Sequence, residues 1–454
     1  MLTPPAAAKA EAVPAKILSS WHAAAVCIGM VIGAGIFITT PLAAANLPSG
    51  GMVLAVWLFG GAMSLAGALC FAEMAAAFPD AGGDYNFLRR AYGDGAGFLF
   101  AWSRFAVIHT GSMALLAFTF GDYLATVAPL GDYGPAAIAA ATIVALAVVN
   151  LAGLRFGVGT QVWLLWLVIG GMAAVIAAGV WLAATGRPPS AAATAAGEAP
   201  LPFALGAALV FVFLAYGGWS DTATLSAEMR DARHGIKRAL VLGMSLVTAL
   251  YVLVNWAYLR GLSHLGLARS EAPAADLLLY AFGTPGQTLI VTIVALTSIT
   301  SMNAILIAGA RTTYAAARDT AGLARLRGWH VARGTPRAAI VATAALALAL
   351  VGFGAYTRGG FATMVDYLSP VYWLFLTLSG IALFVLRRRY PDVPRPFRVP
   401  WYPWVPLAFI ASSAYVLYSS LAYVRVGAVA GVAVLTAGVM LLAALRLGAK
   451  LGRR

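Results

Sequence analysis

The chain has 454 residues, of which 61% are hydrophobic and 10% are charged, and its net charge is +14. An apolar content this high exceeds what a soluble domain of the same size needs, so the composition indicates an integral membrane protein and leaves no room for a large soluble domain. The positive charge is no argument for nucleic-acid binding, because the basic residues lie in the short loops between apolar stretches.

Apolar stretches long enough to cross a hydrocarbon layer of about 30 Å recur along the whole chain. We predict twelve membrane-spanning segments. In chain order they are Leu18–Asn46, Met52–Phe78, Gly95–Val127, Pro135–Leu154, Gly157–Ala184, Phe203–Ala227, Ile236–Leu259, Gln287–Ala317, Ala338–Tyr356, Met364–Leu386, Trp404–Tyr423 and Ala428–Leu447.

The basic residues gather in alternate loops. One set of loops, together with both tails, contains most of the Lys and Arg residues. The opposite loops contain only Arg187, Arg260, Arg269, Arg358 and Arg425. By the positive-inside rule, both termini are predicted to be cytoplasmic, in a multi-pass protein of the plasma (inner) membrane. The residues before Ala15 lack the apolar core of a removable signal peptide, so the first span is the expected insertion signal.

Both cysteines, Cys27 and Cys70, lie in predicted spans, where a thiol is a small buried hydrophobe. We therefore expect no accessory subunit linked by a disulfide. Two enzyme motifs, His-Glu-x-x-His and Gly-x-Ser-x-Gly, are absent from the sequence. The glycine-rich loop Gly93–Gly97 lacks the Lys-Ser/Thr of a nucleotide-binding loop, so neither an enzyme nor a cofactor site is predicted.

Glycines interrupt the first and the sixth predicted span, at Gly33-Ala34-Gly35 and at Tyr216-Gly217-Gly218-Trp219. A glycine in a membrane helix often serves close packing, and Gly29 and Gly33 alone would fit that interpretation. The second interruption favours function, because four full spans separate the two and thus place them at corresponding positions of two five-helix halves. Free N–H groups at such a break suit a carboxylate and free carbonyls suit an ammonium group. The predicted ligand is therefore the zwitterionic backbone of an amino acid.

Several motifs resemble those of the amino acid-polyamine-organocation (APC) transporter superfamily. The segment Gly29-Met-Val-Ile-Gly-Ala-Gly-Ile-Phe37 is similar to the first-helix motif of that superfamily, and the segment from Ala72 to Gly93 is similar to its second helix and the loop that follows. The segment from Phe213 to Trp219, with Ala227-Glu228-Met229, is similar to the sixth helix of the L-type amino acid transporters. The region from Asn303 to Asp319 resembles the end of the eighth helix.

The resemblance implies an all-α membrane protein with the LeuT-type fold. Its expected parts are a tail (1–17), a first repeat of helices one to five (18–184), an inverted second repeat of helices six to ten (201–390), two added helices (403–447) and a second tail (448–454). The residues that it places at the substrate are Val31, Gly33, Ala34, Gly35, Leu214, Ala215, Tyr216, Gly217 and Gly218. Leu214 stands where relatives often carry an aromatic gate.

Polar residues inside the spans are further candidates. His109 lies near the middle of the third span, where an ionisable group is either functional or a neutral imidazole bonded to a carbonyl. Asp221, next to Ser220, either faces the cavity or caps the restarted helix, and we favour the cap. In the eighth span, Thr297, Ser301 and Asn303 are candidates for coupling or specificity, although Ser and Thr in membrane helices commonly bond their own backbone. Glu73 and Glu228 are predicted to form ion pairs with arginines that close an inner gate.

We therefore expect a secondary transporter of amino acids, with neutral L-amino acids as the predicted substrates. Two alternatives remain open, a carrier of cationic amino acids or polyamines that uses Asp221, and a membrane channel. Some relatives place a lysine of the fifth helix at the usual sodium position, and Val168 or Ile169 occupies the matching place here, so a positive charge is absent there. Sodium at the hydroxyls of the eighth span, proton coupling through His109 and uncoupled exchange remain open. Because a Ser/Thr cluster without a carboxylate is poor evidence for a cation site, we expect sodium-independent transport, with His109 as the carrier of any proton dependence.

Overall fold

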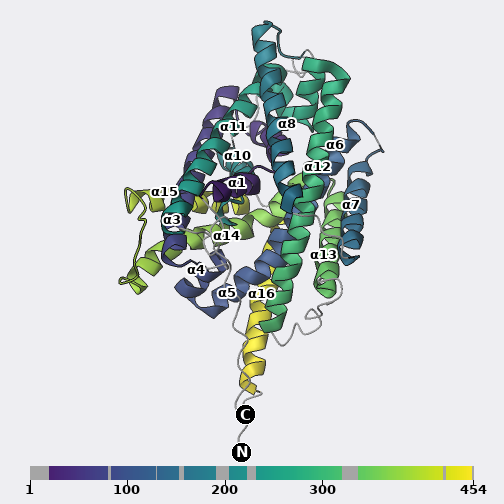
Figure 1. Cartoon of the computed structure of the whole chain (residues 1–454). Coiled ribbons are helices and arrows are strands. Elements are labelled where there is room, and N and C mark those ends of the chain that lie inside the picture. Colours follow the sequence, from purple (N-terminus) through teal and green to yellow (C-terminus); the bar gives the residue numbers. More distant parts are fainter. Residues whose placement is uncertain are drawn as a thin grey trace, which may run out of the picture.

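A computed structural model describes residues 20–79, 83–128, 130–152, 158–190, 204–221, 232–319, 336–422 and 426–451. These residues form helices joined by turns, without a strand among them (Figure 1). In chain order the helices are α1 (Ser20–Val31), α2 (Ile36–Ala44), α3 (Gly50–Ala77), α4 (Asp84–Tyr92), α5 (Asp94–Ser103), η1 (Arg104–His109), α6 (Thr110–Ala125), α7 (Gly134–Leu151), α8 (Val158–Ala184), α10 (Leu205–Ala215), α11 (Ala232–Arg269), α12 (Pro273–Asp319), α13 (Arg337–Tyr356), α14 (Gly360–Arg389), α15 (Trp404–Ala422) and α16 (Val426–Leu451).

Ten spans in the described part of the chain are long and apolar enough to cross a membrane. They coincide with ten of the predicted spans. The third predicted span consists of α5, η1 and α6 in succession. The two remaining predicted spans are the ones in which glycines predicted an interruption. The prediction of an all-helical membrane protein is confirmed, while the total of twelve spans stays a prediction.

The first interruption is present in the structure. Helix α1 ends at Val31 and α2 begins at Ile36. The N–H of Ile32 still donates to the carbonyl of Ile28, whereas residues 33–35 leave the helical hydrogen-bond pattern. In the sixth predicted span, α10 ends at Ala215 and is followed by a turn and a short 3₁₀ segment up to Asp221. The remainder of that span, which includes Glu228, lies outside the described residues.

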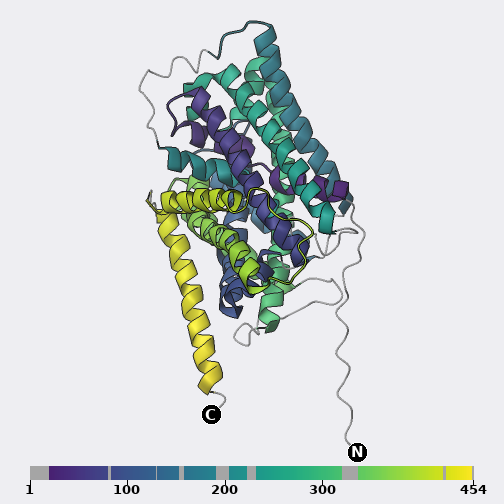
Figure 2. The same ribbon diagram turned by 90° about the vertical axis from the view of Figure 1, so that its left-hand side faces the viewer.

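Helix α11 joins the parts of the molecule that carry the two interruptions. It packs along α3 and against α1, α2 and α8, while α10 packs against α2, α3 and α15. Figure 2 shows α16 running down one side of the molecule, with α15 lying across its direction. Because α11 contacts both halves of the first broken helix, its side chains can reach the breaks from one fixed support.

Three local features differ from the sequence-based expectation. The segment after the second span, expected as a loop, contains the amphipathic helix α4, which buries Phe87 and Leu88 and exposes Arg89 and Arg90. Helix α5 begins at Asp94, so the glycine-rich segment from Gly93 is mostly its first turn. The third span contains a π-helical turn, η1, and such turns frequently occur at functional sites.

Candidate functional site

The two breaks lie against each other. Gly218 has a φ of +100°, and a Cβ built on it would collide with the carbonyl group of Met30 near the end of α1. On the other side, a Cβ on Gly35 would lie 3.9 Å from Cα of Ala215. Only glycine combines this backbone conformation with such a close approach, so the position of Gly218 explains why the second break needs a glycine there.

One hydroxyl group connects the ends of the two broken helices. The Tyr251 hydroxyl of α11 lies 3.0 Å from the carbonyl oxygen of Val31, the last residue of α1. It lies 3.1 Å from the carbonyl oxygen of Ala215, the last residue of α10. A helix end leaves its last carbonyls without an intrahelical partner, and the Tyr251 hydroxyl proton is shared between these two carbonyls. The carbonyl of Val31 also accepts from the backbone N–H of Gly33 at 2.9 Å. The sequence analysis missed this residue, because a tyrosine in an apolar span is no distinctive signal and Tyr258 of the same helix is buried as well.

The first break also offers hydrogen-bond donors. Among the described residues, the backbone N–H groups of Ala34, Gly35 and Ile36 donate to no backbone carbonyl. They stand at the start of α2, where the helix dipole adds a partial positive charge. Three adjacent N–H groups at a helix start can bind a carboxylate. Gly33 and Gly35 are half-buried, so space remains beside them.

The predicted substrate residues of the second break divide into two groups. Leu214, Gly217 and Gly218 are half-buried, whereas Ala215 is buried and Tyr216 is fully buried. The Tyr216 hydroxyl donates to the carbonyl of Trp57 at 2.9 Å, and its ring packs between Trp57 and Tyr251. Tyr216 can therefore offer a ligand only its backbone, while its side chain fixes α10 against α3 and α11.

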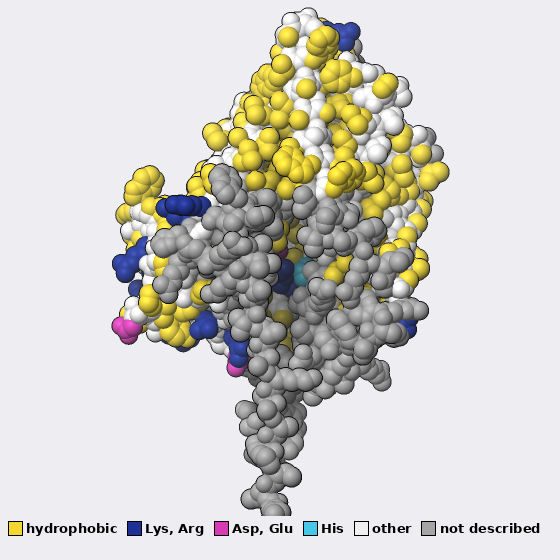
Figure 3. Space-filling model, viewed as in Figure 1, with side chains coloured by type: hydrophobic (Ala, Val, Ile, Leu, Met, Phe, Trp, Pro, Cys, Tyr) yellow, Lys and Arg dark blue, Asp and Glu magenta, His cyan; other side chains and the backbone are white. Residues whose placement is uncertain are grey.

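A partly buried polar cluster lies beside the second break. Arg104, the first residue of η1, donates from Nη1 to Oδ1 of Asp221 at 2.8 Å. Its Nη2 lies 3.2 Å from Nε2 of His109. An arginine can only donate, so Nε2 of His109 accepts and its proton resides on Nδ1, as in a neutral imidazole. Figure 3 shows basic and histidine side chains recessed near the middle of the face that it displays.

The sequence analysis named His109 and Asp221 but missed Arg104, although an arginine inside an apolar span was a visible signal. The π-helical turn explains why Arg104 and His109 meet, because five residues complete about one turn of such a helix and place them one above the other. With Arg104 bound to it, Asp221 contributes to a neutral ion pair. Ser220 is buried next to it. The predicted cap by Asp221 concerns a helix start outside the described residues.

The polar candidates of α12 are engaged mainly in packing. The Thr297 hydroxyl donates to the carbonyl of Ile293 in its own helix at 2.7 Å. Asn303 accepts from Asn150 of α7 at 2.7 Å and so connects two helices. Ser301 is half-buried. Within the described residues, no group of three or more His, Cys, Asp or Glu side chains could hold a metal ion.

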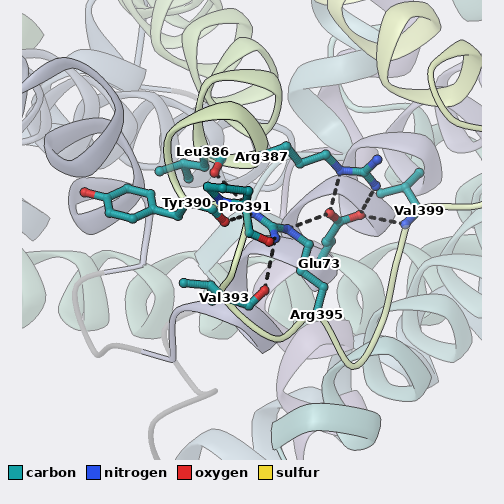
Figure 4. A network of polar contacts seen from close by, with 8 residues as sticks. All are labelled: Glu73, Leu386, Arg387, Tyr390, Pro391, Val393, Arg395 and Val399. Carbon is teal, nitrogen blue, oxygen red and sulfur yellow. Dashed lines mark hydrogen bonds and ion pairs between the residues drawn. The ribbon is translucent and has the colours of Figure 1, made fainter.

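Glu73 forms the predicted ion pairs with arginines. Its carboxylate is 1% exposed and accepts from Nε and Nη2 of Arg387 at 2.7 and 2.6 Å. It also accepts from the backbone N–H of Val399 at 2.7 Å, and Nε of Arg395 lies 3.6 Å away (Figure 4). The network joins α3 to the end of α14 and to the segment that precedes α15. Whether these pairs act as a gate stays a prediction, and Glu228 lies outside the described residues.

Asp84, the first residue of α4, lies outside the membrane-spanning helices and is buried, and its Oδ1 has no hydrogen-bond partner among the described residues. Burial, followed by the negative charge of Asp221, raises the pKa of this carboxyl from 3.8 to about 7, while Arg104 acts in the opposite direction. Asp84 therefore interacts electrostatically with the polar cluster beside the breaks, and a pKa of about 7 makes Asp84 the member that titrates near neutral pH.

Known proteins resemble this chain over most of its length. The sequence profile of the amino acid permease family matches residues 18–445, which include both breaks. The b(0,+)-type amino acid transporter 1 of Mus musculus is 29% identical over 399 residues, covering 86% of this chain and 80% of that protein. The serine/threonine exchanger SteT of Bacillus subtilis (strain 168) is 29% identical over 403 residues, covering 87% and 88%. The large neutral amino acids transporter small subunit 2 of Rattus norvegicus is 28% identical over 432 residues, covering 92% and 78%.

Proposed function

This chain belongs to the amino acid permease family, and from that premise we propose that it transports neutral L-amino acids by alternating access around the two breaks. The relatives are transporters, and the chain is accordingly not an enzyme. In this proposal, residues 18–184 and 201–390 are the two inverted five-helix repeats of a LeuT-type fold, and both termini are cytoplasmic.

The observation that carries the proposal is the juxtaposition of donors and acceptors at the breaks. The N–H groups of Ala34, Gly35 and Ile36 suit the substrate carboxylate. The carbonyls of Val31 and Ala215, which Tyr251 holds at the adjoining helix ends, suit its ammonium group. Donors for a carboxylate next to acceptors for an ammonium group suit the backbone that all α-amino acids share, which leaves the side chain to decide specificity.

The surroundings of the breaks favour a neutral side chain. Leu214 is apolar and half-buried beside the second break. A cationic substrate would need a carboxylate, and Asp221 is bound to Arg104 at 2.8 Å. Removing Asp221 from that pair would leave the Arg104 guanidinium without its counter-ion, which is costly away from water. The names of two relatives, the serine/threonine exchanger and the large neutral amino acids transporter, agree with neutral substrates.

The test is exchange in liposomes that contain the purified protein. Liposomes loaded with unlabelled serine or leucine should accumulate the labelled amino acid in a saturable manner, and lysine, arginine and putrescine should compete weakly. Strong competition by lysine would support the cationic alternative, and a flux proportional to concentration without saturation would indicate a channel. Replacing sodium by choline should leave exchange unchanged, since α12 shows no carboxylate among its Ser and Thr candidates.

A further inference from the structure

The connecting segment, defined here as residues 387–404, runs from the last turn of α14 to the first residue of α15 and combines positive charge with exposed aromatic rings. It contains five arginines and one acidic residue, Asp392. Trp401 and Trp404 are 82% and 73% exposed. Figure 3 shows basic and hydrophobic side chains next to each other on the lobe that this segment forms at the left of Figure 1.

Buried Glu73 fixes this segment against α3. Two points of the segment that are distant in sequence, Arg387 and the N–H of Val399, bind the same carboxylate (Figure 4). Arg395 closes the turn between them, since its guanidinium donates to the carbonyls of Tyr390 at 2.8 Å and of Val393 at 3.0 Å. The segment is therefore a fixed support for the side chains that it exposes.

Two arginines of the segment face away from this network. Arg388 and Arg398 are exposed, and within the part of the chain that the structure describes they form neither an ion pair nor a hydrogen bond. Each adjoins one of the two residues that bind Glu73, Arg387 and Val399, so both are held on the fixed part of the segment. An exposed guanidinium on a rigid support suits a phosphate, because it can donate two hydrogen bonds to the phosphate oxygens, and this segment offers two such groups.

The aromatic residues indicate which phosphate compound this is. Exposed Trp rings are typical of the boundary between lipid headgroups and acyl chains. Tyr402 places its ring under the guanidinium of Arg387, 3.8 Å from the ring centre, so the aromatic and basic groups are parts of one surface. A soluble anion would use the arginines alone, whereas a phospholipid uses both kinds of group.

We propose that the connecting segment is a binding site for the headgroup of anionic phospholipids, in which Arg388 and Arg398 bind the phosphate while Trp401 and Trp404 lie at the headgroup boundary. Basic residues next to membrane helices attract anionic lipids of the adjacent leaflet. The site lies on the predicted cytoplasmic side and is independent of the transported substrate.

Thermal unfolding of the full chain in a neutral detergent tests the site. Added phosphatidylglycerol should raise the midpoint temperature more than phosphatidylcholine with the same acyl chains. The variant Arg388→Gln/Arg398→Gln should lose more than half of this difference, whereas Arg388→Lys/Arg398→Lys should keep most of it. The matched control is Arg187→Gln/Arg269→Gln, which removes the same charge from exposed arginines on the predicted opposite side and should behave like the wild type.

Further measurements distinguish a bound lipid from a bound free anion. If glycerol phosphate alone reproduces the full difference, the site binds a free anion and the lipid proposal is wrong. Equal midpoints with both lipids, or an equal loss in the Arg187/Arg269 control, would also overturn it. Should the Gln variant fail to fold, Trp401→Ser/Trp404→Ser gives an independent test, because it should reduce the phosphatidylglycerol effect while all arginines remain.

Discussion

The hydroxyl oxygen of Tyr251 lies 3.0 Å from the carbonyl oxygen of Val31, at the point where the first broken helix ends. The same oxygen lies 3.1 Å from the carbonyl oxygen of Ala215, where α10 ends. A hydroxyl carries one proton, so the two carbonyls share it. Any movement that separates the two helix ends must change this arrangement, and a substrate ammonium group would bring additional donors to the same carbonyls.

Tyr251→Phe should therefore weaken substrate binding in a protein that still folds. Loss of the hydroxyl leaves the buried Ala215 carbonyl without its donor, and an unsatisfied buried group costs about 1–3 kcal/mol. Because Ala215 adjoins the second break, we expect this free-energy cost to weaken substrate binding, so that the apparent affinity in the exchange assay falls roughly tenfold. The matched control is Tyr258→Phe, seven residues further along the same helix, because this buried hydroxyl has no partner among the described residues. Equal effects of both variants would contradict a special role for Tyr251.

Gly218 is the glycine of the breaks that should tolerate substitution least. In Gly218→Ala, the new Cβ would meet the Met30 carbonyl, and the positive φ would cost roughly 1–2 kcal/mol in addition. The expected result is low yield or a clearly lower midpoint of unfolding. Gly33→Ala is the control, since no atom lies within 4 Å of the added Cβ. A stable Gly218→Ala protein with normal exchange would show that the two breaks are not in this close contact.

Arg104 and Asp221 should behave as one unit. Arg104→Gln and Asp221→Asn should each lower stability, because each leaves a charged group without its partner, and the double variant should lose less than the sum. The coupling free energy is expected to be about 1 kcal/mol, since the side chains are 24% and 38% exposed. Denaturation of the wild type, the two single variants and the double variant measures this coupling free energy. Additive losses would mean that the pair contributes nothing, and a selective loss of lysine transport in Asp221→Asn would favour the cationic alternative.

These residues also show how much the sequence could predict. Glycines fix the positions of the breaks because a helix that must unwind in a membrane needs them, and hydropathy fixes the spans because every backbone group in lipid must be paired internally. Tyr251 could not be found in this way, since its role depends on the packing of α11 against α1 and α10. Arg104 could have been found as a charge within a span. Its pairing with His109 and Asp221 could not, because the π-helical turn that aligns it with His109 has no recognised sequence signal.

Glu73→Gln should destabilise the protein strongly. The substitution leaves Arg387 and Arg395 facing a neutral group in a buried network, and breaking a buried pair typically costs about 3–5 kcal/mol. The control Arg89→Gln breaks the exposed pair with Asp94, whose side chains are 54% and 83% exposed, and should cost less than about 1 kcal/mol. Thermal unfolding in detergent compares the two. Similar midpoints for both variants would mean that the Glu73 network is not a structural connection between α3 and α14.

Asp84 should make the stability of the folded protein depend on pH. Its pKa of about 7 lies above the ordinary value of 3.8, so folding favours the protonated carboxyl. The stability that this group contributes is fully present below about pH 4 and is lost as the pH rises through about 7. The difference between these pKa values corresponds to a loss of about 4 kcal/mol at most in the free energy of unfolding.

In Asp84→Asn the side chain cannot ionise, so the midpoint temperature of unfolding of the wild type should fall relative to that of this variant between pH 4 and 8 and then stay level. Asp94→Asn, an exposed aspartate at the start of α5, is the control for the loss of a carboxylate at a helix start. A constant difference between the wild type and Asp84→Asn across this range would show that Asp84 is ionised throughout.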